Sequence, residues 1–557
     1  MSKSTREEVA RKTGRGFLII TIAKVWFLLT SAVIQLGLPI FLGSPEKFGI
    51  FKIITESIGW INMVMITGTL HAVSKLVSEH PDRAQALVNL AVKIQLLLGV
   101  PVALLYVLAS PFIAERFNDP SLIPLLRLSA GILFFYAFYA IFVGYFNGLK
   151  HFVRQATLDV TFSTVKLVFI VGLVLLGFGV GGAVFGFVAA AGFVCIASVI
   201  WVLRRRRAGE GTDPLPRTEA AASMKRMAGY LLLIMAYTFA LNGVMRIDFL
   251  LLRAIVSEVP ASFVGLEDLF VLMANQFAGF YGAVLNIARI PYQGVIAVTF
   301  VIFPLVSEAT FRDDQAQTRI YIRSTLRYCI LLIGVVALLL AFNSDSIIAA
   351  LYSEEYQQGA VALSILSVSI IFFALLYVAS TIIIGSGHPL VAFAIMGVSL
   401  VTSAVANFFL LNWVHSDTME MLEAGGLDDP AVVEASFGAQ ATIYAQWAAI
   451  ATTLAMVVGF LLAVLWLWRT FEAAPPMATI GRVLLIAALL YGIDQVAVLP
   501  VELVDDLGKI LYLGLVLGKM TLMGLVALAV LFLTREFTKT DFDRLRAVIG
   551  KRSSRGS

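Results

Sequence analysis

The chain has 557 residues, of which 59% are hydrophobic and 14% are charged, and its formal net charge is +5. This composition excludes a soluble globular protein and indicates a chain whose solvent is a lipid bilayer. Its apolar runs are about 20 to 28 residues long, a length that suits membrane-spanning helices rather than a membrane barrel. We therefore expect an all-α polytopic membrane protein.

The first segment, MSKSTREEVARKTGRG, is too polar for a signal peptide, and the apolar run that follows continues past Pro39. That run is therefore predicted to be retained as a helix. Cys195 and Cys329 lie inside apolar runs without metal-ligand neighbours. Neither a disulfide framework nor a redox role nor a metal site is predicted from them.

In chain order, the apolar runs predict fourteen membrane spans, namely residues 17–41, 49–74, 87–112, 122–148, 156–177, 181–203, 228–255, 278–306, 322–343, 360–385, 389–413, 438–468, 478–499 and 508–533. The first six spans form an N-terminal lobe, residues 1–203, and a basic linker follows at residues 204–227. The next six form a second lobe at residues 228–468. Two extra helices and a basic tail complete the chain at residues 469–557.

The segments that connect these spans are alternately rich and poor in basic residues. If the N-terminus is cytoplasmic, the inner segments hold most of them, including the run Arg204–Arg207 and a tail from Arg535 to Arg555. By the positive-inside rule, both termini are expected in the cytoplasm. The run Arg204–Arg207 follows a span directly, so it indicates a topology anchor that faces anionic lipid rather than a nucleic-acid site.

The stretch Tyr281–Glu308 has a weaker copy at Phe48–Lys75, and the segments 148–151 and 385–388 match in the same order. Ordered matches predict a duplicated half. Internal repeats in a polytopic chain indicate a transporter whose site lies between the halves. The alternative is that glycine-rich apolar helices match by chance. The inserted segment Val259–Ala278 is expected to lie on the outer surface as a short amphipathic helix.

Ionisable residues inside the spans are the strongest functional signal, because a cation at membrane depth costs about 2.5 to 3.5 kcal/mol on an insertion scale. Such groups should pair or face a wet cavity. The cations are Lys24, Lys52, Lys93, Lys166, Arg246, Arg289 and Lys519, and the acids are Glu56, Asp159 and Asp248.

We hypothesise that Lys24, Lys166, Arg246 and Arg289 line a cationic substrate cavity between the halves. Arg289 is the strongest candidate, since it lies just before Pro291 and the repeat aligns it with Glu56. The alternative is that these cations only pair between helices, and Lys24 can also snorkel to the inner surface.

Several possible pairs follow from spacing along a helix. Lys52 and Glu56 are i, i+4 neighbours, and Asp159 shares a helical stripe with Lys166. Arg246 and Asp248 point to different faces, so they should not pair. Lys519 lies outside the repeat and is a candidate for a lipid groove.

Enzyme signatures are missing from the sequence. It contains neither a G-x-x-x-x-G-K-S/T phosphate loop nor an H-E-x-x-H zinc motif. We therefore expect a chain that is not an enzyme and has neither catalytic residues nor a cofactor.

Four stretches carry a family resemblance: YGAVLNIARIPYQGVIAVTFVIFPLVSEAT, IDFLLL, GYFNGLKHF and GSGHPLVAFAIMGVSLVTSAVANFFLL. They resemble the polysaccharide-transport (oligosaccharide or O-antigen) flippases of the multidrug/oligosaccharidyl-lipid/polysaccharide exporter superfamily, with lipid II flippases as close relatives. The resemblance implies a fourteen-helix fold in the cytoplasmic (inner) membrane. It also implies export of a polyprenyl-diphosphate-linked oligosaccharide by alternating access, with Na+ or H+ as a possible coupling ion. The partners expected are this lipid-linked glycan and membrane lipids, with the chain acting as a monomer beside glycan-assembly enzymes.

Three alternatives remain open. A lipid II flippase has the same chemistry with different sugars. A cation or drug antiporter of the multidrug and toxin extrusion type calls for an acidic cavity, which the excess of cations in the spans disfavours. A membrane glycan polymerase or ligase calls for a long external catalytic loop, and the predicted external loops are short.

Overall fold

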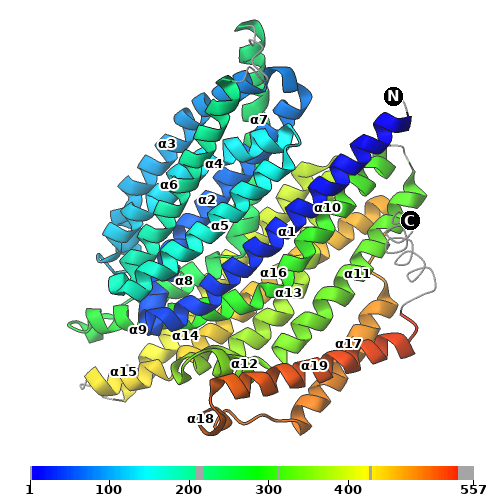
Figure 1. Ribbon diagram of the computed structural model, residues 1–557. Coiled ribbons are helices and arrows are strands. Elements are labelled where there is room, and N and C mark those ends of the chain that lie inside the picture. Colours follow the sequence, from blue (N-terminus) through cyan, green and yellow to red (C-terminus); the bar gives the residue numbers. More distant parts are fainter. Residues whose placement is uncertain (1–2, 208–216, 312–313, 426–429, 537–557) are drawn as a thin grey trace. The chain divides into compact units, whose positions relative to one another are not determined.

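The computed structural model describes residues 3–207, 217–311, 314–425 and 430–536, and within these ranges all regular elements are helices (Figure 1). Among the described residues, thirteen candidate spans are long and apolar enough to cross a membrane. One of them, Phe152–Arg204, covers two of the spans predicted from sequence. The predicted all-α polytopic membrane class is therefore confirmed. The centre of the predicted linker and most of the predicted basic tail lie outside the described residues.

The chain forms two compact units, and the division crosses three long helices. Unit 1 consists of Met1–Asn286 and Met396–Ala451. It holds α1 (Lys3–Leu42), α2 (Pro45–Glu79), α3 (Ala84–Arg116), α4 (Leu122–Gly148), α5 (Phe152–Leu173), α6 (Gly179–Arg207), α7 (Arg217–Val244), α8 (Ile247–Val256), nearly all of α9 (Glu267–Ala288), α15 (Pro430–Gly438), and parts of α14 (Pro389–Ala424) and α16 (Ala441–Phe471).

Unit 2 consists of Ile287–Ile395 and Thr452–Ser557. It holds α10 (Ile290–Phe311), α11 (Gln315–Ala341), α12 (Ser344–Leu351), α13 (Ala360–Gly385), α17 (Met477–Val496), α18 (Leu503–Leu507) and α19 (Lys509–Leu533). Short helical turns connect some of the helices. Unit 1 has them at Pro81–Arg83, Val174–Phe178 and Ala261–Phe263, and unit 2 has one at Glu354–Gly359. The predicted division into two lobes, a linker and two extra helices stays a prediction.

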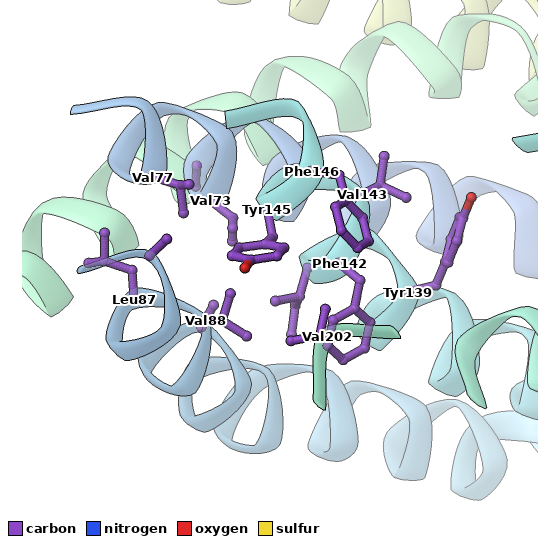
Figure 2. Packing of buried hydrophobic residues seen from close by; sticks show 14 of the residues in the cluster. Val73, Val77, Leu87, Val88, Tyr139, Phe142, Val143, Tyr145, Phe146 and Val202 are labelled. Atoms are coloured by element: carbon purple, nitrogen blue, oxygen red, sulfur yellow. The ribbon is translucent and has the colours of Figure 1, made fainter. Parts of the chain in front are cut away.

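The first helices of unit 1 surround an aromatic core. In Figure 1, α2, α3, α4 and α6 run side by side, and Figure 2 shows Tyr145 of α4 among Val73, Leu87 and Val88. The Tyr145 side chain is buried, and its hydroxyl oxygen accepts a hydrogen bond from Nε2 of Gln85 at 2.9 Å. A buried hydroxyl needs such a partner, since leaving it unpaired costs about 1 to 3 kcal/mol.

Helices α2 and α9 touch through bare backbone. A Cβ atom added at Gly49 of α2 would lie 1.9 Å from the carbonyl oxygen of Asn275. A Cβ atom added at Gly279 of α9 would lie 2.1 Å from the carbonyl oxygen of Pro45. Glycine at both positions therefore lets the two helix axes approach more closely than any side chain permits.

Two predicted spans are broken in the structure. The expected span 278–306 divides at Arg289, where α9 ends and α10 begins. Proline has no N–H and disfavours helical conformation in the residue before it, so Pro291 is tolerated only in the first turn of α10. The expected span 228–255 likewise divides between α7 and α8, just after Gly243, a residue of low helix propensity.

The expected amphipathic surface helix at residues 259–278 was wrong for most of that segment. From Glu267 onward the chain is already part of α9, and Phe270 and Phe277 are fully buried. Both rings pack against Phe437 of α15, with ring centroids 5.1 and 5.5 Å apart. This part of the apolar segment therefore belongs to a protein core and not to a membrane surface.

In unit 2, α17 and α19 pack on α11 through an apolar cluster that includes Leu338, Ile486, Leu490 and Met523. Beyond the end of α19, Glu536 is buried and joins the three helices. Its carboxylate accepts hydrogen bonds from Nε of Arg327 at 2.6 Å and Oγ1 of Thr479 at 2.8 Å, and it is paired with Arg482. One acid thus fastens α11 to the hairpin that α17 and α19 form.

We predict that Gly49→Ala destabilises the protein, because the added methyl group forces α2 away from α9. Overpacking of this kind costs about 1 to 3 kcal/mol. The apparent Tm of the purified chain in detergent measures the loss. Gly172→Ala is the matched control, since no atom lies within 4 Å of a Cβ at Gly172. Equal Tm values for the two variants would contradict the close approach.

We predict that the ion pairs of Glu536 with Arg327 and Arg482 weaken in acid. Burial by itself raises the pKa of Glu536, but the hydrogen bonds from Arg327 and Thr479 and the charges of Arg327 and Arg482 outweigh it, so the pKa lies below the ordinary 4.5. A lowered pKa gives stability that is complete above pH 4.5 and is lost as the pH falls through the folded-state value.

Measurement of Tm between pH 7 and pH 3 checks this. The wild-type chain should lose more thermal stability below pH 4.5 than Glu536→Gln, which lacks the titrating group. Identical pH profiles for the two proteins would show that the ion pairs of Glu536 add no pH-dependent stability.

Candidate functional site

The charged residues of the spans in unit 1 fall into two clusters. In the first, Nζ of Lys24 on α1 lies 2.8 Å from Oδ2 of Asp159 on α5. The hydroxyl of Tyr139 on α4 donates to Oδ1 of the same carboxylate at 3.2 Å. Asp159 is nearly buried, whereas the Lys24 side chain is 53% exposed. The acid is therefore fixed by three helices, and its basic partner retains access to the surroundings.

Lys166 lies on the same helix as Asp159 but has a different environment. Its ammonium lies over the rings of Phe27, Phe162 and Phe187, at 5.4, 5.6 and 5.3 Å from their centroids. The acid that could have paired with it, Asp159, is engaged by Lys24 instead. Among the described residues, no carboxylate lies within ion-pair distance of Lys166. Aromatic faces stabilise a cation without neutralising it.

Lys24 and Lys166 share one ring. Nζ of Lys24 lies 5.8 Å from the centroid of Phe27, and Nζ of Lys166 lies 5.4 Å from it. Two ammonium groups thus lie near a single aromatic side chain, and the cluster holds one carboxylate, Asp159. The first cluster therefore carries an excess positive charge.

The second cluster centres on Glu56 of α2, whose side chain is only 4% exposed. Its Oε1 lies 2.7 Å from Nζ of Lys52, one turn earlier on the same helix. Its Oε2 is paired with Nη1 of Arg246, the residue directly before α8. The pair of Lys52 and Glu56 expected from helical spacing is therefore present, and Arg246 joins it from a different element.

Polar groups around this cluster extend it to α9 and α1. Nζ of Lys52 donates to Oδ1 of Asn286 at 2.8 Å, and Nδ2 of Asn286 donates to the carbonyl oxygen of Gln35 at 2.8 Å. Two cations and one carboxylate are thus held in a buried network, where a hydrogen-bonded partner is required for each charge.

Asp248 lies near this cluster in sequence and is fully buried. Its Oδ2 accepts a hydrogen bond from the hydroxyl of Tyr281 at 2.7 Å, and its Oδ1 accepts one from the backbone N–H of Phe249 at 2.8 Å. An acid in the first turn of a helix is also favoured by the helix dipole. These contacts tie the beginning of α8 to α9.

The remaining two predicted site residues belong to unit 2. Arg289 is half-buried at the break between α9 and α10. Lys519 of α19 is bound by Asp494 of α17, with Nζ 2.7 Å from Oδ1. Its predicted role in a lipid groove, like the cavity that Arg289 was expected to line, stays a prediction.

Sequence reasoning missed some residues that the structure brings together. Arg253 was not among the candidate charged residues of the spans, but it is fully buried in unit 1. Its Nε donates to Oδ1 of Asn275 at 3.0 Å, its Nη1 donates to the carbonyl oxygen of Phe117 at 3.0 Å, and its Nη2 lies 3.6 Å from Asp119. Its position inside the predicted span 228–255 was the signal that could have found it.

Unit 1 also contains a cavity of about 650 Å³ between the α3–α4 and α8–α9 connections. Glu115, Glu258 and Glu267 line it together with apolar residues. None of the predicted cationic residues lines this cavity. It therefore does not coincide with the site expected from sequence.

Comparison with known proteins gives both a family and a fold. A family model described as "Polysaccharide biosynthesis protein" matches residues 42–361. No curated protein matches the chain. Among solved structures, lipid II flippase MurJ in an inward closed conformation aligns with a TM-score of 0.66 and 13% identity, covering 92% of this chain and 99% of that chain.

Multidrug resistance MATE family transporters of the MOP superfamily are also similar. An inward-facing structure aligns with a TM-score of 0.55 and 12% identity, covering 82% of this chain and 99% of its own. An outward-facing structure aligns with a TM-score of 0.54 and 14% identity, covering 83% of this chain and 97% of its own.

At such low identity these structural matches concern the fold alone. The family match is independent of them and covers more than half of the chain. It confirms the resemblance to polysaccharide transporters that was predicted from the four sequence stretches. The chain therefore belongs to the polysaccharide biosynthesis protein family.

Proposed function

We propose that the chain is a flippase that moves a polyprenyl-diphosphate-linked oligosaccharide across the cytoplasmic membrane by alternating access. The family supports a role in polysaccharide biosynthesis. The fold is that of transporters, among them a lipid II flippase. A transporter in such a pathway has to carry a large polar sugar and a diphosphate past the bilayer core while the lipid tail stays in the membrane.

One observation carries this proposal. Lys166 presents a cation at membrane depth that is surrounded by three phenylalanine rings and has no carboxylate within ion-pair distance among the described residues. A positive charge kept at such cost is a functional signal. Its chemistry suits a phosphate oxygen, because an ammonium donates strong charge-assisted hydrogen bonds to phosphate.

Lys24 is the second group that we assign to the diphosphate. It also lies near the Phe27 ring and is half-exposed, so its ammonium can leave Asp159 and turn to a ligand. Arg246 and Arg289 are the other two cations that we assign to substrate binding. A membrane potential that is negative inside favours export of an anion by about 2.3 kcal/mol per charge per 100 mV.

The surroundings of the protein belong to the same proposal. Both termini lie in the cytoplasm, in keeping with the positions of the basic residues. The chain acts as a monomer beside glycan-assembly enzymes and performs no catalysis. Na+ or H+ is the candidate coupling ion.

A lipid II flippase is the second candidate, and its support is the fold likeness to lipid II flippase MurJ. The same cations would serve its diphosphate, since the two substrates differ in their sugars. A drug antiporter is a weaker candidate, because organic cations call for an acidic cavity and the first cluster carries excess positive charge.

Deletion of the gene separates these candidates. We predict that a lipid-linked oligosaccharide accumulates on the cytoplasmic side and that the surface glycan is lost, because export is blocked while synthesis continues. Extraction and mass spectrometry of lipid-linked glycans identify the species. Accumulation of lipid II would favour the second candidate, and drug sensitivity with an intact surface glycan would contradict both flippases.

We predict that Lys166→Ala lowers transport by about tenfold or more, because a charge-assisted hydrogen bond to phosphate contributes about 1.5 to 3 kcal/mol. Complementation of the deletion strain measures it, with membrane expression checked by immunoblot. Arg289→Ala is expected to lower transport as well. Lys93→Ala is the matched control, because Lys93 is an exposed lysine of α3. Full activity of Lys166→Ala at normal expression would remove Lys166 from the site.

A further inference from the structure

Glu56 occupies the position of an anion between two cations that come from separate elements. Lys52 lies on its own helix, α2, and Arg246 lies at the junction of α7 and α8. We infer that the Glu56 carboxylate is a built-in stand-in for the substrate's phosphate, and that the arriving diphosphate displaces it from Arg246. This inference rests on the proposed function and assigns a regulatory role within the same site.

Glycines beside the cluster leave space for its two cations. A Cβ atom added at Gly59, on α2, would lie 2.9 Å from Nη1 of Arg246, so glycine leaves the space that the guanidinium fills. A Cβ atom added at Gly282, on α9, would lie 2.7 Å from Cγ of Lys52. Small residues on two helices thus make room for both cations around a single carboxylate.

The two ion pairs of Glu56 differ in how readily they can break. Lys52 and Glu56 are one turn apart on α2, so this pair persists whatever α8 does. The pair of Glu56 and Arg246 joins different elements and breaks if Arg246 turns to another anion. Lys52 then still neutralises Glu56, so the exchange does not leave a bare carboxylate in the protein interior, which is the costly outcome.

A diphosphate has the advantage in this competition. It carries more negative charge than a carboxylate, and a guanidinium can hold two phosphate oxygens at once. Binding therefore removes the electrostatic link between α2 and the α7–α8 junction. The link holds the empty protein in one conformation, and the substrate releases it.

The test measures binding of farnesyl diphosphate, a short prenyl diphosphate, to the purified full-length chain in detergent by titration calorimetry. Glu56→Gln should bind it about tenfold more tightly than wild type, because the competing charge is gone and close charge pairs couple by at least this much. Arg246→Gln should bind it more weakly. In the Arg246→Gln background, Glu56→Gln should raise the affinity much less.

Thermal unfolding gives a second readout. Glu56→Gln should lower Tm, since Lys52 and Arg246 lose their shared counter-charge, while the affinity rises. A residue with a merely structural role would lower both. If Glu56→Gln fails to fold, Glu56→Asp keeps the charge but shortens the reach to Arg246, and it should raise the affinity by a smaller factor.

Glu536→Gln is the matched control, because Glu536 is another buried acid bound by two cations and lies in unit 2. It should lower Tm without changing the affinity. If wild type binds and Arg246→Gln weakens binding, but Glu56→Gln and Glu56→Asp bind no more tightly than wild type, the stand-in role is overturned and the proposed function stands. If wild type does not bind farnesyl diphosphate, both fall.

Discussion

A charge placed at the depth of a bilayer must be neutralised, hydrated or used, and the arrangement of unit 1 follows from this constraint. Its acids do not stand alone: Asp159 is bound by Lys24, and Glu56 is bound by Lys52 and Arg246. The first cluster holds two lysines, Lys24 and Lys166, and one acid, Asp159. The positive charge of Lys166 lies over three phenylalanine rings, which stabilise it without neutralising it. Such a surplus suits a protein that receives its missing negative charge from a substrate.

Helix α2 carries both the close contact with α9 and the ion pairs of Glu56. Along one stretch it carries Gly49, which touches α9, then Lys52 and Glu56, and then Gly59, which makes room for Arg246. The same helix packs its later turns into the aromatic core around Tyr145. A change of partner at Glu56 therefore acts on the helix that also contacts α9 and the core around Tyr145.

The class of the fold could be predicted from sequence, because bilayer thickness sets the length of an apolar run and the apolar bilayer core sets its hydropathy. The breaks in two spans could not, although Pro291 and Gly243 lay within them, because many membrane helices carry such residues without breaking. The burial of α9 was missed for a related reason. Its apolar face fits a membrane surface as well as a protein core, and only tertiary packing against Phe437 decides between them.

Charged residues were found from sequence more readily than their partners. Lys52 and Glu56 could be paired because both lie on one helix, whereas the contacts of Glu56 with Arg246 and of Asp159 with Lys24 join elements far apart in the chain. Helical spacing favoured Lys166 as the partner of Asp159. The structure gives that place to Lys24, and this exchange leaves Lys166 with its aromatic neighbours.

The glycine contact between α2 and α9 has a kinetic implication. Where helices meet through interlocked side chains, separation needs many torsions to change together. Here the main chains of α2 and α9 meet at Gly49 and Gly279, so side chains do not interlock at these two positions. Fewer side-chain torsions therefore have to change at this point than at an interlocked contact when the distance between the two helices changes.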